Sequence, residues 1–237
     1  MAIPPWARKL LTPFIGPPAD LWDAHWPDYY KRYAKANEAG WPAQRQLHEV
    51  PVVVLDTETT GLDIHRDRIL SIGGLRVVGN SILLGDKFEA YLPTPPGLSV
   101  EAAIRIHGII PNSQRYTYTD EPALLPRLLD WVGNSIIVGH HIGFDVALLN
   151  QALKRDGAGP LRNKIVDTAD LAVRLRPAGY WSPKQDYSLD ALARRHRVPL
   201  SDRHTALGDS YITAVLWLKL LTRLGTKAKR YLLVGDV

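Results

Sequence analysis

A short apolar run rich in β-branched residues indicates a buried strand early in the chain. The residues Val52-Val53-Val54-Leu55 include no polar side chain, and such runs are typical of strands that are buried on both faces. A sheet that contains such a strand needs further layers to cover it. The run therefore favours a central sheet flanked by helices.

Later segments complete the expected sheet. Residues 68–78 and 81–92 are predicted strands joined by the turn-forming pair Gly79-Asn80, so the first three strands should form an antiparallel meander. Two later strands, at 136–138 and 165–166, are expected to be parallel. Helices are predicted at residues 27–39, 99–106, 119–132, 144–155, 168–175, 188–196 and 205–224. The predicted fold class is α/β, with a mixed five-stranded sheet flanked by helices.

Composition divides the chain into three segments. Residues 1–49 form an aromatic, proline-rich and partly helical extension that holds four of the seven tryptophans. The main domain is expected over residues 50–226, and a short tail over residues 227–237. We expect the aromatic face of the extension to dock on the main domain. The alternative is an arm that binds a protein partner or a second copy of the chain.

Charge and cysteine content limit the class of protein. Residues 151–237 contain 16 Lys and Arg against 8 Asp and Glu, a net charge of +8, which suits a polyanionic ligand or simply a solvated surface. The chain has no cysteine, which excludes disulfides, thiolate zinc sites and a cysteine nucleophile. This favours a cytoplasmic location, although a secreted protein without cysteine would look the same. Since no apolar run approaches the roughly 18 residues of a membrane span, no membrane association is expected.

Two carboxylates follow the apolar run. Asp56 and Glu58 lie two residues apart, so on a strand they point to the same face. Two buried like charges are costly unless a cation neutralises them, and oxygen ligands favour Mg²⁺ or Mn²⁺ over zinc. Acids at a strand end can equally be capping or surface residues, so this pair alone does not decide between the two interpretations.

Acidic and histidine residues recur near the starts of two later helices. Asp145 begins the helix after the fourth strand, where the helix dipole also favours a carboxylate, and Asp167 after the fifth strand has the same alternative explanation. His204 and Asp209 converge best if His204 lies on the loop before the last helix. The apolar stretch 211–221 would bury that helix and hold Asp209 rigidly.

In order and spacing, these residues resemble the three exonuclease motifs of the DnaQ-like, DEDDh-type 3′–5′ exonucleases. The matching segments are Asp56-x-Glu58 followed by Thr-Thr-Gly-Leu, His140-x-x-x-Phe144-Asp145 and His204-x-x-x-x-Asp209. The resemblance covers about residues 50–222, and Ile106-His107-Gly108-Ile109 is similar to a further family segment. It implies a ribonuclease H-like fold. One difference is His141, where the family commonly has Asn.

The resemblance also implies a metal site. The residues that would hold two divalent cations, Mg²⁺ or Mn²⁺, are Asp56, Glu58, Asp145 and Asp209. His204 would be the general base, because histidine can accept a proton near neutral pH. Two cations would stabilise both the attacking and the departing oxygen of the phosphodiester.

Four further residues are implied in binding the terminal nucleotide. Thr59, Gly61 and Leu62 would contact its sugar and base, and His107 would lie beside it. Leu62 would either replace base stacking as an apolar wedge or be an ordinary core residue. Asp167 is expected to support the site without binding a metal.

The predicted function is metal-dependent 3′–5′ hydrolysis of single-stranded or frayed DNA by a two-metal mechanism. An RNA or short-oligonucleotide exonuclease is the first alternative, because recognition of a 2′-hydroxyl depends on pocket geometry. A non-catalytic nucleic-acid-binding or polymerase-associated protein is the second. The complete set of acids argues against a non-catalytic protein, since an inactive site has no physical reason to keep four converging charges.

Overall fold

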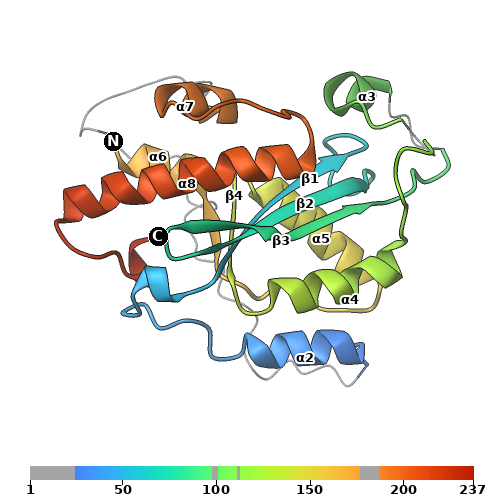
Figure 1. Ribbon diagram of the computed structural model, residues 1–237. Coiled ribbons are helices and arrows are strands. Elements are labelled where there is room, and N and C mark those ends of the chain that lie inside the picture. The colour runs from blue at the N-terminus through green and yellow to red at the C-terminus, as the bar shows by residue number, and fades with distance from the viewer. Residues whose placement is uncertain (1–24, 98–100, 111–112, 177–186) are drawn as a thin grey trace, which may run out of the picture.

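The protein is built around a five-stranded sheet with helices on both faces (Figure 1). The computed structural model describes residues 25–97, 101–110, 113–176 and 187–237. The strands are β1 (Val52–Thr59), β2 (Ile69–Val78), β3 (Ser81–Tyr91), β4 (Ile136–Gly139) and β5 (Ile165–Asp167). The described helices are α2 (Asp28–Ala36), α3 (Glu101–His107), α4 (Glu121–Val132), α5 (Gly143–Arg155), α6 (Thr168–Arg174), α7 (Leu189–Arg195) and α8 (Ala206–Ala228), with the short 3₁₀ helices η1 (Leu47–Glu49) and η3 (Val234–Asp236).

The sheet combines antiparallel and parallel pairs. Its order is β3-β2-β1-β4-β5. β1 pairs antiparallel with β2, and β2 with β3 across the turn at Gly79 and Asn80, whereas β1 pairs parallel with β4, and β4 with β5. Parallel neighbours require a crossover connection, and α5 provides the one between β4 and β5. The predicted α/β class and the mixed five-stranded sheet are confirmed.

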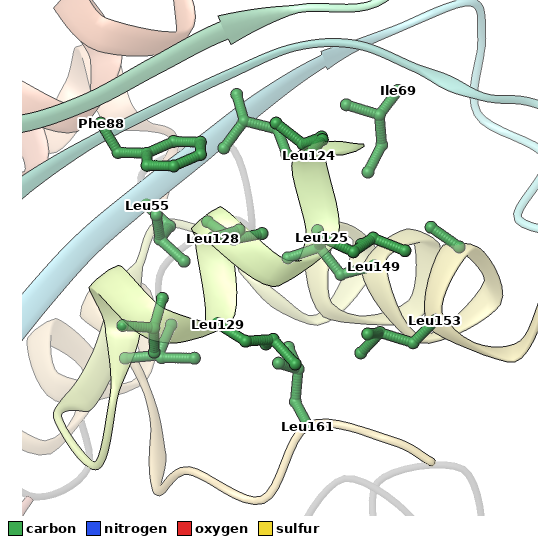
Figure 2. Close-up of a cluster of buried hydrophobic side chains, with 14 of the residues drawn as sticks. Leu55, Ile69, Phe88, Leu124, Leu125, Leu128, Leu129, Leu149, Leu153 and Leu161 are labelled. Carbon is green, nitrogen blue, oxygen red and sulfur yellow. The ribbon is translucent and has the colours of Figure 1, made fainter. Parts of the chain in front are cut away.

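One face of the sheet is covered by α4 and α5. The apolar side chains of α4 follow the spacing of one helical face and are at most 1% exposed at Leu124, Leu125, Leu128 and Leu129. They form one cluster with Leu55 of β1, Phe88 of β3 and Leu149 of α5 (Figure 2). Full burial of a leucine side chain contributes about 1.5–3 kcal/mol, so this layer fixes both helices against the sheet.

The opposite face is covered by α8, with α6 and α7 beside it (Figure 1). Trp217 of α8 is 1% exposed and belongs to the same cluster as Val52 and Val54 of β1. Alternate residues of a strand share a face. Asp56 and Glu58 therefore continue the face of β1 that α8 covers.

The described part of the N-terminal extension packs on the main domain. Tyr30 and Tyr33 of α2 are buried in the same core as the leucines of α4. The Tyr33 hydroxyl donates to Asn163 Oδ1 at 2.5 Å and accepts from the backbone N–H of Arg162 at 2.7 Å. This aromatic face docks as expected, while residues 1–24 lie outside the described residues. The division of the chain into an extension, a domain and a tail remains a prediction.

Several limits of the elements differ from those predicted. α2 ends at Ala36, three residues before the predicted end. α4 is capped by Asp120 instead of Thr119, because the Asp120 carboxylate accepts a backbone N–H of the first turn at 2.9 Å. The predicted cap Ser99 lies outside the described residues. α8 continues to Ala228, into the segment predicted as a tail.

The chain folds back against the domain after α8. The Leu47 backbone N–H donates to the Leu232 carbonyl at 2.9 Å, and Val234, at 2% exposed, belongs to the core beneath α8. α8 itself has 23 residues. Neither α8 nor any other helix in the described part of the chain combines the length and the apolar character that crossing a membrane requires.

Candidate active site

Three carboxylates from distant parts of the chain meet at one end of the sheet. Asp56 and Glu58 lie on the last half of β1, and Asp209 lies in the first turn of α8. Each offers one oxygen, and these oxygens all lie within 4.8 Å of one another. The structure thus brings together three of the four predicted metal ligands, which we call the carboxylate cluster.

A close contact between β2 and α8 sets the position of the third carboxylate. A Cβ on Gly73 of β2 would lie 2.2 Å from the carbonyl carbon of Ala206 and from the nitrogen of Leu207. The Ser210 hydroxyl also donates to the Gly73 carbonyl at 2.9 Å. The first turn of α8 therefore rests directly on the backbone of β2. Gly73 was not predicted as a site residue, although glycine inside a strand often marks close backbone approach.

Asp145, the fourth predicted ligand, lies beside the carboxylate cluster. It is not among the acids whose oxygens all lie within 4.8 Å of one another. It is 7% exposed in the first turn of α5. Its Oδ1 accepts hydrogen bonds from the backbone N–H and the hydroxyl of Thr57, at 2.9 and 2.5 Å. Burial is the largest cause of the raised pKa of Asp56, and the charge of Asp145 is the second largest. Asp145 is therefore tied to β1 and is electrostatically part of the site.

Burial and crowding raise the pKa values of these acids. The pKa of Glu58 rises to about 7, first because the side chain is buried and then because Asp209 and Asp145 repel its charge. Burial raises the pKa of Asp145 to about 6 against the opposing hydrogen bonds from Thr57. Burial, followed by the neighbouring charges, also raises the pKa of Asp56 well above its usual range. Added positive charge would lower these pKa values and favour the ionised acids.

Arg203 supplies part of that positive charge. Its Nη1 forms an ion pair with Asp209 Oδ2, and its Nε donates to Asp190 Oδ1 of α7 at 2.6 Å. Within the described residues, Asp209 Oδ1 is buried and has no hydrogen-bond partner. A buried carboxylate oxygen without a partner is costly, and a bound cation would satisfy it. Arg203 was not predicted, and the only sequence signal for it is its position beside His204.

His204 lies on the loop before α8, as predicted. The next residue, Thr205, caps the helix by accepting the Gly208 N–H at 3.1 Å. His204 has a φ of 63°, a left-handed conformation that is uncommon outside glycine but in which histidine is enriched. Its side chain is exposed. The assignment of His204 as the general base stays a prediction.

His107 lies near this loop and near the end of β1. It ends α3, is 9% exposed, and accepts the Ile109 N–H on Nδ1 at 3.0 Å. Burial lowers its pKa; the backbone of Thr59 opposes this shift, and the charge of His204 adds to it. His107 therefore lies near both Thr59 and His204, at the edge of the site where a terminal nucleotide was expected.

The loop after β1 presents Leu62 to solvent. Leu62 is 87% exposed, so the alternative in which it is a core residue is wrong. Asp67 holds the loop, because its carboxylate accepts hydrogen bonds from the Thr60 hydroxyl and the Asp63 N–H, both at 2.7 Å. A Cβ on Gly61 would lie 2.6 Å from Asp67 Oδ2. A side chain at this position would therefore displace the Asp67 carboxylate that holds the loop.

Asp167 caps α6 and also binds the segment that carries the second motif. Asp167 Oδ1 accepts the N–H groups of Ala169 at the start of α6 and of His141, at 2.8 and 3.1 Å. His141 has a φ of 53°, a left-handed conformation in which both Asn and His are enriched. His140 Nδ1 lies 2.9 Å from the Thr168 hydroxyl, and burial lowers the His140 pKa to about 3. His140 is therefore neutral near pH 7.

Comparisons with known sequences agree with these motifs. The model of the RNase_T exonuclease family matches residues 53–216. The PolC-type DNA polymerase III of Bacillus subtilis is 32% identical over 193 residues, which are 80% of this chain and 13% of the polymerase. That of Staphylococcus haemolyticus is 30% identical over 186 residues, which are 77% of this chain and 12% of the polymerase. The chain thus spans about an eighth of the length of these curated relatives.

Solved structures share the fold. A crystal structure of E. coli exonuclease I in complex with a dT13 oligonucleotide matches with a TM-score of 0.64 and 22% identity, over 76% of this chain and 43% of that chain. Its complex with a dA16 oligonucleotide matches with the same TM-score and identity, over 75% and 42% of the two chains. These matches confirm the predicted ribonuclease H-like fold. Since the family match spans the strands and the carboxylate cluster, the chain belongs to the RNase_T family of DnaQ-like exonucleases.

Proposed function

We propose that this exonuclease domain removes nucleotides from the 3′ end of single-stranded or frayed DNA by a metal-dependent, two-metal mechanism. The carboxylate cluster is the observation that carries the proposal, because its three acids offer oxygens within 4.8 Å of one another. The raised pKa values of Asp56 and Glu58 show that this arrangement is unfavourable without added positive charge. A protein that only binds nucleic acid would have no physical need for it.

The residues present fit divalent cations. Asp56, Glu58 and Asp209 offer oxygen ligands, which Mg²⁺ and Mn²⁺ prefer, and Asp209 Oδ1 is a buried oxygen with no partner among the described residues. Asp145 would contribute its second oxygen, since its Oδ1 is held by Thr57. The bound cations would activate the nucleophilic water and neutralise charge on the phosphodiester.

The residues around the carboxylate cluster would position the substrate and move one proton. His204, on the exposed loop before α8, would accept the proton of the attacking water. Leu62 would lie against the terminal base in place of a stacked neighbour, and Gly61 and Thr59 would contact the terminal sugar. His107 would close the other side of the terminal nucleotide, since it lies near both Thr59 and His204.

Single-stranded DNA is the substrate with the strongest support. E. coli exonuclease I has been solved with dT13 and dA16 oligonucleotides, and the curated relatives are DNA polymerases by name. Residues 151–237 carry a net charge of +8, which favours a polyanionic ligand. The 3′–5′ direction rests on the resemblance of the three motifs.

End-labelled digestion tests the proposal. Matched DNA and RNA strands with free or blocked 3′ ends are incubated with Mg²⁺, Mn²⁺ or EDTA, and the products are sized on a gel. We expect stepwise shortening of DNA that requires both a free 3′ end and a metal. Asp209→Asn should abolish it, whereas His204→Ala should leave a small residual rate that recovers at higher pH.

A matched substitution far from the carboxylate cluster provides the control. Asp28→Asn makes the same chemical change in α2, on a side chain that is 91% exposed, and should leave the rate unchanged. A folded Asp209→Asn variant with the wild-type rate would contradict the proposed metal site. Equal shortening of strands with blocked 3′ ends would contradict the direction, and faster digestion of RNA would contradict the proposed substrate.

A further inference from the structure

Tyr91 lies on the same face of the sheet as the carboxylate cluster, two strands away. Glu58 on β1 pairs with Ser71 on β2, which pairs with Tyr91 at the end of β3. Residues that pair directly across neighbouring strands project to the same face. Because neighbouring strands are about 4.8 Å apart, Tyr91 lies roughly 10 Å from Glu58.

An aromatic cluster is built around Tyr91. The ring of Tyr116 stacks on that of Tyr91, with centroids 4.0 Å apart and planes inclined by 21°. Tyr118 meets Tyr116 edge-on at 6.4 Å, and the guanidinium of Arg115 lies 5.6 Å from the centre of the Tyr116 ring. The Thr119 N–H donates to the Tyr91 carbonyl at 2.9 Å, which fastens the segment to β3. We call the following residues the tyrosine platform: Tyr91, Arg115, Tyr116 and Tyr118.

The tyrosine platform is accessible and carries positive charge. Arg115 is exposed and the three tyrosines are partly exposed. Tyr91, Arg115 and Tyr116 line an open depression of about 460 Å³. Glu89 also lines this depression, but its carboxylate is engaged by Lys87 Nζ at 3.4 Å and by the Tyr91 hydroxyl at 3.1 Å. In the part of the chain that the structure describes, no carboxylate forms an ion pair with Arg115. Its charge is therefore available to a phosphate.

We propose that the tyrosine platform binds bases of a single strand upstream of the bond that is cleaved. The proposal rests on the proposed function, which brings the 3′ end to the carboxylate cluster. Aromatic rings stack on every base, and arginine adds contacts to the strand that carries them. Stacked nucleotides follow one another at about 3.4 Å, so the roughly 10 Å between Glu58 and Tyr91 corresponds to about three nucleotides.

The test compares a substrate that reaches the tyrosine platform with one that does not. KM and kcat are measured on dT10 and on the dinucleotide dT2. Loss of one base stack in Tyr116→Ala should raise KM for dT10 about tenfold and leave KM for dT2 and both kcat values unchanged. Tyr116→Phe, which keeps the ring, should behave as wild type. Arg115→Ala should also raise KM for dT10 and make it less sensitive to salt.

The control is Tyr231→Ala, which removes a tyrosine that is 77% exposed and lies outside the platform. If Tyr116→Ala changes KM equally for dT10 and dT2, the proposal is overturned, because a purely structural role would impair both substrates. If it changes KM for neither substrate, the proposal is also overturned. Failure of the proposed function is seen separately, as absence of hydrolysis by the wild type. Fluorescence anisotropy of labelled dT10 then decides: weaker binding by Tyr116→Ala supports the platform, and equal binding overturns it.

Discussion

Alanine at Gly73 would test whether the contact between β2 and α8 positions the carboxylate cluster. The new Cβ would lie 2.2 Å from backbone atoms of Ala206 and Leu207, whereas ordinary contact begins at 3.4 Å. The first turn of α8 and β2 must therefore move apart by about 1.2 Å, the difference between the two distances. Backbone atoms lie on both sides of the contact, so no flexible side chain can absorb the overlap.

A displacement of this size is large for a metal site. Ligand distances are held within about 0.2 Å, and Asp209 is carried by the turn that moves. We expect metal-dependent hydrolysis by Gly73→Ala to fall about 100-fold or more. Overpacking costs about 1–3 kcal/mol, which in a chain of this length lowers Tm by about 2–12 °C.

The measurements are single-turnover hydrolysis of 5′-labelled dT10 and thermal unfolding followed by circular dichroism. Gly85→Ala is the matched control, because Gly85 also lies in a strand and a Cβ there would meet nothing within 4 Å. It should leave the rate unchanged and Tm unchanged or slightly higher. A Gly73→Ala variant with wild-type rate and Tm would refute the argument.

Two further substitutions test the charge of the site and the docking of α2. The pKa of Glu58 is raised from its ordinary value of 4.5 to about 7, so the folded wild type loses stability as the pH rises through this range. In EDTA, Glu58→Gln should therefore stabilise the protein by up to about 3 kcal/mol more at pH 8 than at pH 4. Equal melting shifts at both pH values would contradict this. Tyr33→Phe leaves the buried Asn163 Oδ1 without its donor, so denaturant unfolding should show a loss of about 1–3 kcal/mol. The exposed control Tyr231→Phe should lose less than about 0.5 kcal/mol, and equal losses would contradict the argument.

Much of the fold could be predicted because its signals are local. The apolar run at 52–55 indicated the buried β1, and Gly79-Asn80 located the turn between β2 and β3. Helix ends were less certain, because they depend on which side chain reaches a free N–H. At α4 two neighbouring residues could cap, and Asp120 does so instead of Thr119.

The residues that hold the site together were harder to predict than its acids. Gly73 acts by lacking a side chain where α8 meets β2, and Arg203 acts through ion pairs to Asp190 and Asp209 on two helices. Both effects depend on contacts between segments that are distant in the sequence. The exposure of Leu62 likewise required the structure, because an apolar residue after a strand fits a core as well as a surface.

The hydrogen bonds around Asp67 affect the free energy with which the loop after β1 would bind a ligand. With Thr60 and Asp63 both bonded to one carboxylate, the backbone on either side of Leu62 is held in place before anything binds. Ordering a flexible loop or side chain on binding costs free energy. Because this loop backbone is already ordered in the folded protein, most of the backbone part of that cost does not arise on binding. A ligand that binds against Leu62 should therefore not require the loop to close, and its release should not require the loop to open again.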